Sequence, residues 1–112
     1  MIGPITDAGR RGWQRRAVRV LAELLARAGR DLPPLRWTVA TRAALTGYVE
    51  EYDPTRARQQ FEAWTAAVGA TPWPERGPAG GRIHLHAVRE HYDGLVTVAV
   101  IADIDEEEGS RP

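Results

Sequence analysis

The segment from Arg82 to Asp105, RIHLHAVREHYDGLVTVAVIADID, constrains the fold of this chain more than any other. Apolar and polar residues alternate on both sides of Asp93-Gly94, a dipeptide typical of a two-residue type I′ hairpin turn. If these two residues form the centre of the turn, Tyr92 lies opposite Leu95, and paired residues share a face of the sheet. Because a shift of one residue would exchange the two faces, the alternation predicts a single register.

This register separates the hairpin into an apolar and a mixed face. The apolar face, apart from Arg89, carries Ile83, Leu85, Ala87, Val96, Val98, Val100 and Ala102. The mixed face carries His84, His86, Val88, Glu90, Tyr92, Leu95, Thr97, Ala99, Ile101 and Asp103. We therefore expect the first face to pack in the core and the second to stay open.

Two other segments have the spacing of amphipathic helices. The first ends at Gly29 and has the apolar stripe Trp13, Ala17, Val20, Leu21, Leu24, Leu25 and Ala28. The second opens at Asp53-Pro54, a good N-cap followed by a good first helical residue, and ends at Gly69. Its stripe is Ala57, Phe61, Trp64 and Val68.

The remaining segments complete a predicted α-β-β-α-β-β order. Residues 35–40 and 45–51 alternate as strands, whereas residues 70–81, rich in Gly and Pro, are typical of a loop. The order predicts an α+β fold with a four-stranded, mostly antiparallel sheet and two helices packed on one face. At 112 residues we expect a single domain, 1–112, with a flexible basic arm at 1–11 and an acidic flexible tail at 104–112.

Composition excludes several kinds of chemistry. The chain has no Cys, so disulfides and thiolate metal sites are excluded, and it has no Lys. No apolar run approaches the ~20 residues of a membrane span, and the first residues do not resemble a secretory signal, so we expect a cytoplasmic protein without membrane contact. The formal net charge of zero argues against extensive nucleic-acid binding.

The histidines raise the question of a metal site. His84 and His86 have His-x-His spacing, and Asp103 opposite His84 could be a third ligand. His91 falls on the other face, and the sequence has no HExxH motif. We therefore interpret His84 and Asp103 as a cross-strand pair and expect neither a metal nor another cofactor.

Catalytic motifs are also missing. Ser110 is the only Ser, and it lies in the predicted tail, which argues against a Ser-His-Asp triad. Gly80-Gly81 precede a predicted strand and not a helix, unlike a phosphate-binding loop. The sequence favours a role other than catalysis and identifies no catalytic residue.

A basic cluster opens the first helix. Its members are Arg10, Arg11, Arg15, Arg16 and Arg19. Cations at a helix N-terminus oppose the helix dipole. Three explanations stay open: the acidic run from Asp103 to Glu108 offsets them in cis, an acidic partner or nucleic-acid phosphate does so, or the solvated helix tolerates them.

The open sheet face is the predicted binding surface. Its candidate residues are Tyr48, His84, His86, Val88, Tyr92, Leu95, Thr97, Ile101 and Asp103, with Trp73 as a loop contact. An apolar centre with a polar rim is typical of a protein interface, so we expect an interaction or regulatory module, with a homodimer as its simplest form. The alternatives are a small-ligand or metal-binding domain, enzymatic or not, that uses His84 and His86, and nucleic-acid binding through the basic helix.

The composition and the run LPPLRWTVA…FEAWTAAVGATPW resemble small uncharacterised α+β proteins of GC-rich actinobacteria. The resemblance implies the fold class and carries no known function.

Overall fold

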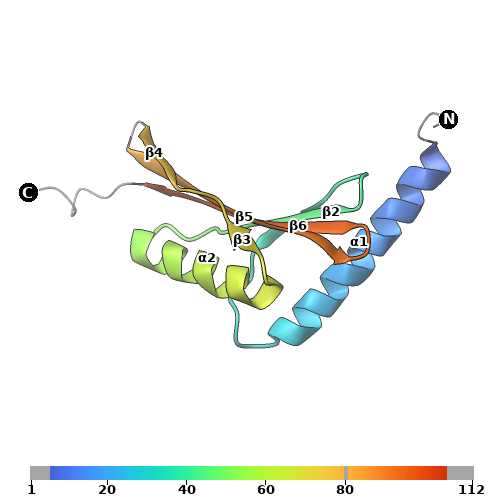
Figure 1. Cartoon of the computed structure of the whole chain (residues 1–112). Helices are drawn as coiled ribbons and strands as arrows, with labels where there is room; N and C mark the ends of the chain where they lie inside the picture. Colours follow the sequence, from blue (N-terminus) through green and yellow to red (C-terminus); the bar gives the residue numbers. More distant parts are fainter. Residues whose placement is uncertain (1–5, 80, 106–112) are drawn as a thin grey trace, which may run out of the picture.

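The computed structural model describes residues 6–79 and 81–105, which form two helices and one sheet (Figure 1). The helices are α1 (Asp7–Ala28) and α2 (Pro54–Val68). The strands are β1 (Arg36–Val39), β2 (Ala44–Tyr48), β3 (Thr71–Pro72), β4 (Arg76–Ala79), β5 (Arg82–Asp93) and β6 (Val96–Asp105). The α+β class is thereby confirmed.

The helix α1 begins earlier than we predicted. Thr6 is its N-cap, and the Thr6 hydroxyl accepts a hydrogen bond of 3.0 Å from the Gly9 amide. The prediction of a flexible arm over residues 1–11 is therefore wrong for residues 7–11, and residues 1–5 lie outside the described part. At the other end, β6 continues to Asp105, two residues into the predicted tail. Residues 106–112 lie outside the described part.

The helix α2 has the ends that the sequence predicts. The Asp53 side chain accepts a hydrogen bond of 2.9 Å from the Arg56 amide, and Pro54 follows as the first helical residue. Gly69 ends the helix in the left-handed conformation, with φ 76°. The predicted stripe of α2 is buried, including Phe61 and Trp64, so its expected core face is confirmed.

The sheet differs from the prediction in strand number and in one direction. Among the described residues it has six strands, in the order β1-β2-β6-β5-β3, with β4 also pairing with β5. The central strands β2 and β6 are parallel, whereas the other pairs are antiparallel. The two hairpins join through these central strands, with α2 in the connection between them. The pairing of β2 with β6 joins segments that are far apart in the sequence, so the alternation within each strand does not predict it.

The two additional strands come from the segment predicted to be a loop. The 12-residue strand β5 pairs with β6 along one edge only. The chain that follows α2 pairs with the other edge of β5, at Thr71 and Arg76. The Trp73 amide donates a hydrogen bond of 2.7 Å to the His86 carbonyl. Pro and Gly are compatible with such short edge strands, so their abundance did not exclude pairing.

The register of the long hairpin is confirmed away from its turn. His84 pairs with Asp103, and Val88 pairs with Ala99, as predicted. Leu85 and Ala87 lie on the other face and are buried.

Near the turn the predicted register is wrong. Asp93 pairs with Val96, so the turn residues are Gly94 and Leu95. A bulge lies between the pairs that Arg89 and Asp93 form with β6, and within it His91 adopts a φ of 56°. The His91 Nδ1 atom lies 2.8 Å from the Gly94 carbonyl oxygen. Residues 90–92 of β5 oppose one residue of β6 there, and within this bulge Tyr92 turns from the predicted open face toward the core.

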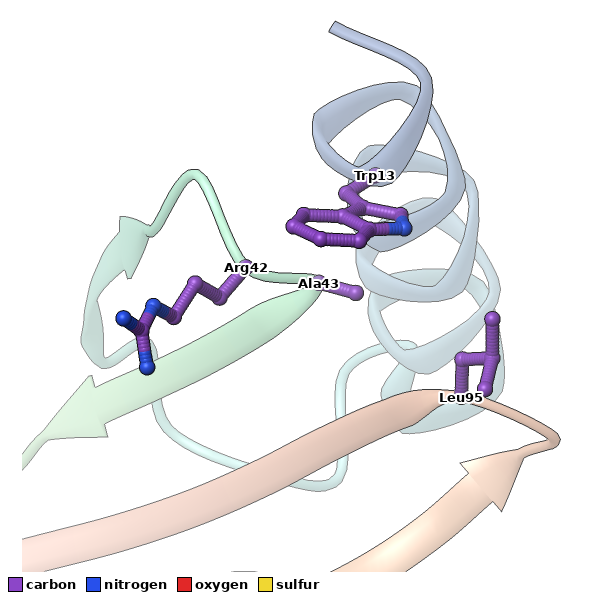
Figure 2. A pocket seen from close by; sticks show the side chains of 4 residues that line it. All are labelled: Trp13, Arg42, Ala43 and Leu95. Atoms are coloured by element: carbon purple, nitrogen blue, oxygen red, sulfur yellow. The ribbon is translucent and has the colours of Figure 1, made fainter. Parts of the chain in front are cut away.

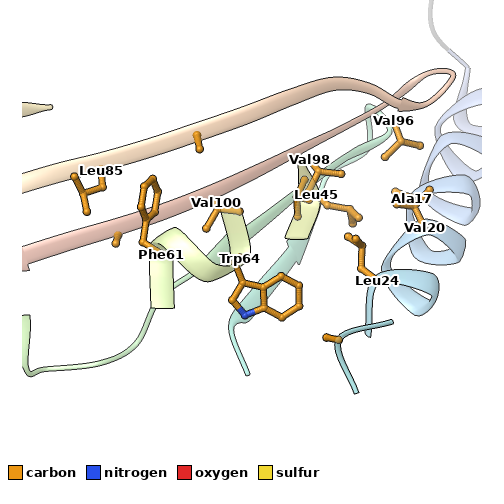
Figure 3. Packing of buried hydrophobic residues seen from close by; sticks show 14 of the residues in the cluster. Ala17, Val20, Leu24, Leu45, Phe61, Trp64, Leu85, Val96, Val98 and Val100 are labelled. Carbon is orange, nitrogen blue, oxygen red and sulfur yellow. The ribbon is translucent and has the colours of Figure 1, made fainter. Parts of the chain in front are cut away.

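Both helices pack on one face of the sheet, as predicted (Figures 1 and 3). In the core, Trp64 contacts Trp37 edge to face at 5.5 Å between ring centroids, and its indole N–H donates to the Pro33 carbonyl at 2.7 Å. The first buried residue of α1 is Ala17, so the preceding turns extend beyond the sheet (Figure 1). Leu25, predicted to be in the core stripe, is 47% exposed.

Candidate functional site

The candidate site is the face of the sheet opposite the helices. Its centre consists of Val88, Ala99 and Ile101 on the neighbouring strands β5 and β6. Ala99 is only 8% exposed and lies between Thr46 of β2 and Val88 of β5. Thr46 and Tyr48 continue the same face onto β2, opposite Ala99 and Ile101. We call this surface the uncovered face.

Most of the predicted binding residues lie on the uncovered face. The pairing places Tyr48, His84, His86, Val88, Thr97, Ile101 and Asp103 there. Trp73 joins them, because it stacks on the His86 ring at 3.9 Å between centroids with an interplanar angle of 13°.

Two predicted residues lie elsewhere. The bulge turns Tyr92 toward α1, where its hydroxyl accepts a hydrogen bond from Arg27. Leu95 lies in the hairpin turn and is 58% exposed. Leu95, Trp13, Ala43 and the stem of Arg42 line a hollow of about 340 Å³ between α1 and the two turns (Figure 2). The assignment of Tyr92 and Leu95 to the uncovered face is therefore wrong.

The histidines form a short chain of polar contacts. His84 Nδ1 lies 2.7 Å from an Asp103 carboxylate oxygen, and His84 Nε2 lies 3.3 Å from His86 Nδ1. The predicted cross-strand pair of His84 with Asp103 is confirmed. The carboxylate favours a proton on His84 Nδ1, which orients the ring toward His86.

Metal binding finds little support in this arrangement. Within residues 6–79 and 81–105, no group of three or more His, Asp or Glu residues could hold a metal ion. His84 and His86 instead contact each other, and His86 is covered on one side by Trp73. The prediction that no metal binds stays a prediction.

Charged residues form the rim at one end of the uncovered face. Arg36 pairs with Glu50 at 3.0 Å, and its guanidinium lies 4.3 Å from the centroid of the Tyr48 ring. Arg82 pairs with Asp105 at 3.2 Å. These four charged side chains, together with Glu51 and Asp103, line a polar hollow of about 510 Å³.

The basic cluster lies at the opposite end of the molecule. Arg10, Arg11, Arg15, Arg16 and Arg19 are all exposed on α1. Arg10 lies 3.8 Å from Asp7 within the first turn. The described carboxylates of the acidic run, Asp103 and Asp105, bond to His84 and Arg82 instead. They therefore do not offset the arginines in cis.

Sequence reasoning missed a cleft between α2 and the β3 edge of the sheet. It has a volume of about 310 Å³ and is lined by Arg58, Phe61, Glu62, Thr65, Ala66, Pro72, Trp73, Glu75, Leu85 and His86. Thr65 is 8% exposed, and its hydroxyl has no hydrogen-bond partner in the described part of the chain. The sequence signal that could have indicated this cleft is Thr65, a polar residue four positions after Phe61 within the apolar stripe of α2.

An ion pair closes one end of this cleft. Arg58 of α2 donates a hydrogen bond of 2.7 Å to the Glu75 carboxylate. This hydrogen bond, with the charge of Arg58, lowers the pKa of Glu75 below its ordinary value. Glu75 is therefore ionised at neutral pH, and the pair is lost only as the pH falls through the lowered pKa.

The fold and this surface define a two-layer α+β protein with one uncovered sheet face. A comparison with known proteins found no matching family model, no matching curated protein and no matching solved structure. The resemblance to actinobacterial proteins therefore stays a prediction. In the part of the chain that the structure describes, no helix is long and apolar enough to span a membrane.

Proposed function

We propose that the protein is a cytoplasmic interaction module that forms a homodimer through its uncovered sheet face. The observation that carries this proposal is the apolar centre of that face, Val88, Ala99 and Ile101, over which no described element lies. Apolar sheet surface of this kind is usually buried by a second layer. A second copy would supply that layer.

The charges of the rim favour a protein surface over nucleic acid. Arg36 and Arg82 are each paired within the chain, to Glu50 and Asp105. With Glu51 and Asp103 the rim has four carboxylates against two guanidinium groups, so it has no excess of positive charge for a phosphate backbone. A partner that brings positive charge to this end is the better match, and a second copy has the basic cluster of α1.

The shape of the face suits sheet-on-sheet packing. The side chains at its centre are small or of medium size, from Thr46 across Ala99 to Val88. Two such faces can approach to the ~10 Å that separates stacked sheets. The chain is 19 Å thick in its shortest dimension, which accommodates one sheet and one layer of helices. A dimer would therefore have helices outside and two sheets inside.

The distribution of charge favours one orientation of the two copies. The basic cluster of α1 and the hollow lined by Glu50, Glu51, Asp103 and Asp105 lie at opposite ends of the sheet (Figure 1). If the strands of the two copies run antiparallel, each basic helix lies near the acidic end of the other copy. The opposite orientation would bring like charges together. A two-fold axis satisfies both contacts at once.

The described part of the acidic run lies far from the basic cluster of the same chain. The ten-residue strand β6 is about 33 Å long, and its first residue, Val96, lies at the end that contacts α1. Within the described chain the cluster has Asp7 of the same helix 3.8 Å from Arg10. A second copy in the antiparallel orientation would add the carboxylates of its acidic end.

Sedimentation equilibrium of the wild type and of Ile101→Glu tests the proposal. We expect a dimer for the wild type and a folded monomer for Ile101→Glu, because a buried glutamate would have no partner. Leu25→Glu is the control: Leu25 is 47% exposed on the C-terminal half of α1, away from the uncovered face and from the basic cluster, and the variant should stay dimeric. A wild type that is monomeric at millimolar concentration would contradict the proposal.

A further inference from the structure

We propose that the cleft between α2 and the β3 edge binds a small, largely apolar molecule that carries one hydroxyl or amino group and no negative charge. This inference goes beyond the proposed dimer and does not depend on it. It rests on the size of the cleft, on the Thr65 hydroxyl and on the charges around the opening.

The size and lining of the cleft are those of a small ligand site. Its volume of about 310 Å³ is at the lower end of the ~300–1,000 Å³ typical of such sites. An apolar cavity of about 150 Å³ accepts benzene, so this cleft has room for a two-ring molecule. The buried side chains of Phe61 and Leu85 form an apolar floor. Trp73 forms a wall that His86 supports by stacking.

The Thr65 hydroxyl supplies the polar contact. Thr65 is one of the residues that line the cleft, and its hydroxyl oxygen is buried and has no hydrogen-bond partner among the described residues. An unsatisfied buried hydroxyl is unfavourable, and each such group in a native structure asks for an explanation. A rotation of the Thr65 side chain about χ1 can turn the hydroxyl toward the cleft, where a ligand hydroxyl or amino group can satisfy it, because a threonine hydroxyl both donates and accepts. A purely apolar ligand cannot.

The charges around the cleft exclude an anionic ligand. Two carboxylates, Glu62 and Glu75, line it against one guanidinium, Arg58. Arg58 already donates to Glu75. An incoming carboxylate or phosphate would therefore meet net negative charge. A neutral ligand meets no such penalty, and an amine is attracted by these carboxylates and by the Trp73 ring.

Isothermal titration calorimetry with 2-naphthylmethanol tests the proposal. This probe has two rings and one hydroxyl. We expect saturable one-to-one binding to the wild type and about tenfold weaker binding to Thr65→Val, which keeps the shape and removes the hydroxyl. The apolar analogue 2-methylnaphthalene should bind the wild type and Thr65→Val equally well. The anionic analogue 2-naphthoate should bind at least tenfold more weakly than 2-naphthylmethanol.

Two neighbouring alanines on α2 provide a matched pair of variants. Ala66 lines the cleft, whereas Ala67 is exposed and does not line it. Ala66→Phe should abolish binding of 2-naphthylmethanol, and Ala67→Phe should leave it unchanged. If either variant fails to fold, NMR shift mapping on the wild type takes its place and should locate the changes at Phe61, Thr65 and Trp73.

Three results would overturn the proposal. The first is no saturable binding of 2-naphthylmethanol to the wild type. The second is binding that Thr65→Val leaves unchanged, and the third is equal binding by Ala66→Phe and Ala67→Phe or shift changes located elsewhere. Because Ile101→Glu lies outside the cleft, its monomeric form should bind the probe as the wild type does. Failure of the dimer and failure of this site are therefore distinguishable.

Discussion

At the scale of single residues, Gly47 is the position where the sheet has least room. It is buried on β2 opposite Trp37, and an added Cβ would lie 2.8 Å from Leu35 Cδ1 and 3.0 Å from the Trp37 ring. The ring of Trp37 thus occupies the space that a side chain on Gly47 would fill. Trp37 in turn contacts Trp64. Because Gly47 has no Cβ, the Trp37 ring can lie over β2 and contact Trp64 of α2.

We predict that Gly47→Ala destabilises the protein by about 1–3 kcal/mol, because overpacking forces these rings to move. Chemical denaturation measures the change in unfolding free energy. Gly12→Ala is the control: it lies inside α1 with nothing within 4 Å of its added Cβ. Since alanine is the better helix former, that variant should gain about 0.5–1 kcal/mol. Equal effects of the two substitutions would mean that Trp37 does not lie over Gly47.

The contact between His84 and His86 leads to a second prediction at this scale. We expect one equivalent of Zn²⁺ to leave thermal stability unchanged, because these rings bond to each other and to Asp103. A tight site would be obvious: metal at 100 times its dissociation constant adds about 2.7 kcal/mol. Thermal unfolding with Zn²⁺ and with chelator makes the comparison. Stabilisation that His84→Gln with His86→Gln removes would show a metal site after all.

At the scale of elements, α1 consists of two unequal halves. Its buried residues are Ala17, Val20, Leu24 and Ala28, all in the C-terminal part. The N-terminal part carries the basic cluster, and its Trp13 packs against the edge of the core and lines the hollow beside Ala43 and Leu95 (Figure 2). Most helical stability in proteins comes from packing of an apolar face. The first turns therefore depend on their N-cap and on Trp13.

Hydrogen exchange of the Ile101→Glu monomer should detect this difference. We predict that amides of residues 11–16 exchange at least tenfold faster than those of residues 20–28, because local opening of the first turns exposes little apolar surface. Amides in the centre of α2 are the internal reference. Equal protection along α1 would show that its N-terminal half is packed in the monomer.

At the scale of the whole molecule, the charges are segregated although the formal net charge is zero. The arginines of α1 lie at one end, and Glu50, Glu51, Asp103 and Asp105 lie at the other. Sequence alone left three explanations for the basic cluster. Asp103 and Asp105 lie at the far end of β6 and bond to His84 and Arg82, which disfavours the intramolecular explanation, and the proposed antiparallel dimer uses the second.

The proposed orientation predicts a salt-dependent dimer. We expect the dissociation constant to rise about tenfold between 50 and 500 mM NaCl, because salt screens exposed charges. Arg15→Glu with Arg19→Glu should weaken the dimer further, while Arg30→Glu, at an exposed arginine outside the basic cluster and the acidic hollow, should have little effect. Sedimentation velocity at each salt concentration measures this. If neither salt nor the arginine variants change the dissociation constant, the uncovered face remains the interface and the antiparallel orientation is wrong.

Local patterns in the sequence determined both helices, both caps of α2, the C-terminal end of α1, the strands of the two hairpins, and the pairing of His84 with Asp103. Each depends on residues that are close in the chain or related by one alternation. Only the tertiary structure decided the parallel contact of β2 with β6, the pairing of β3 and β4 with β5, and the cleft beside Thr65. These features join segments whose preference for each other is not visible in their own periodicity. The bulge at His91 belongs with them, because the contacts of Tyr92 with Arg27 and of His91 with Gly94 accompany a register that the Asp93-Gly94 signal alone does not predict.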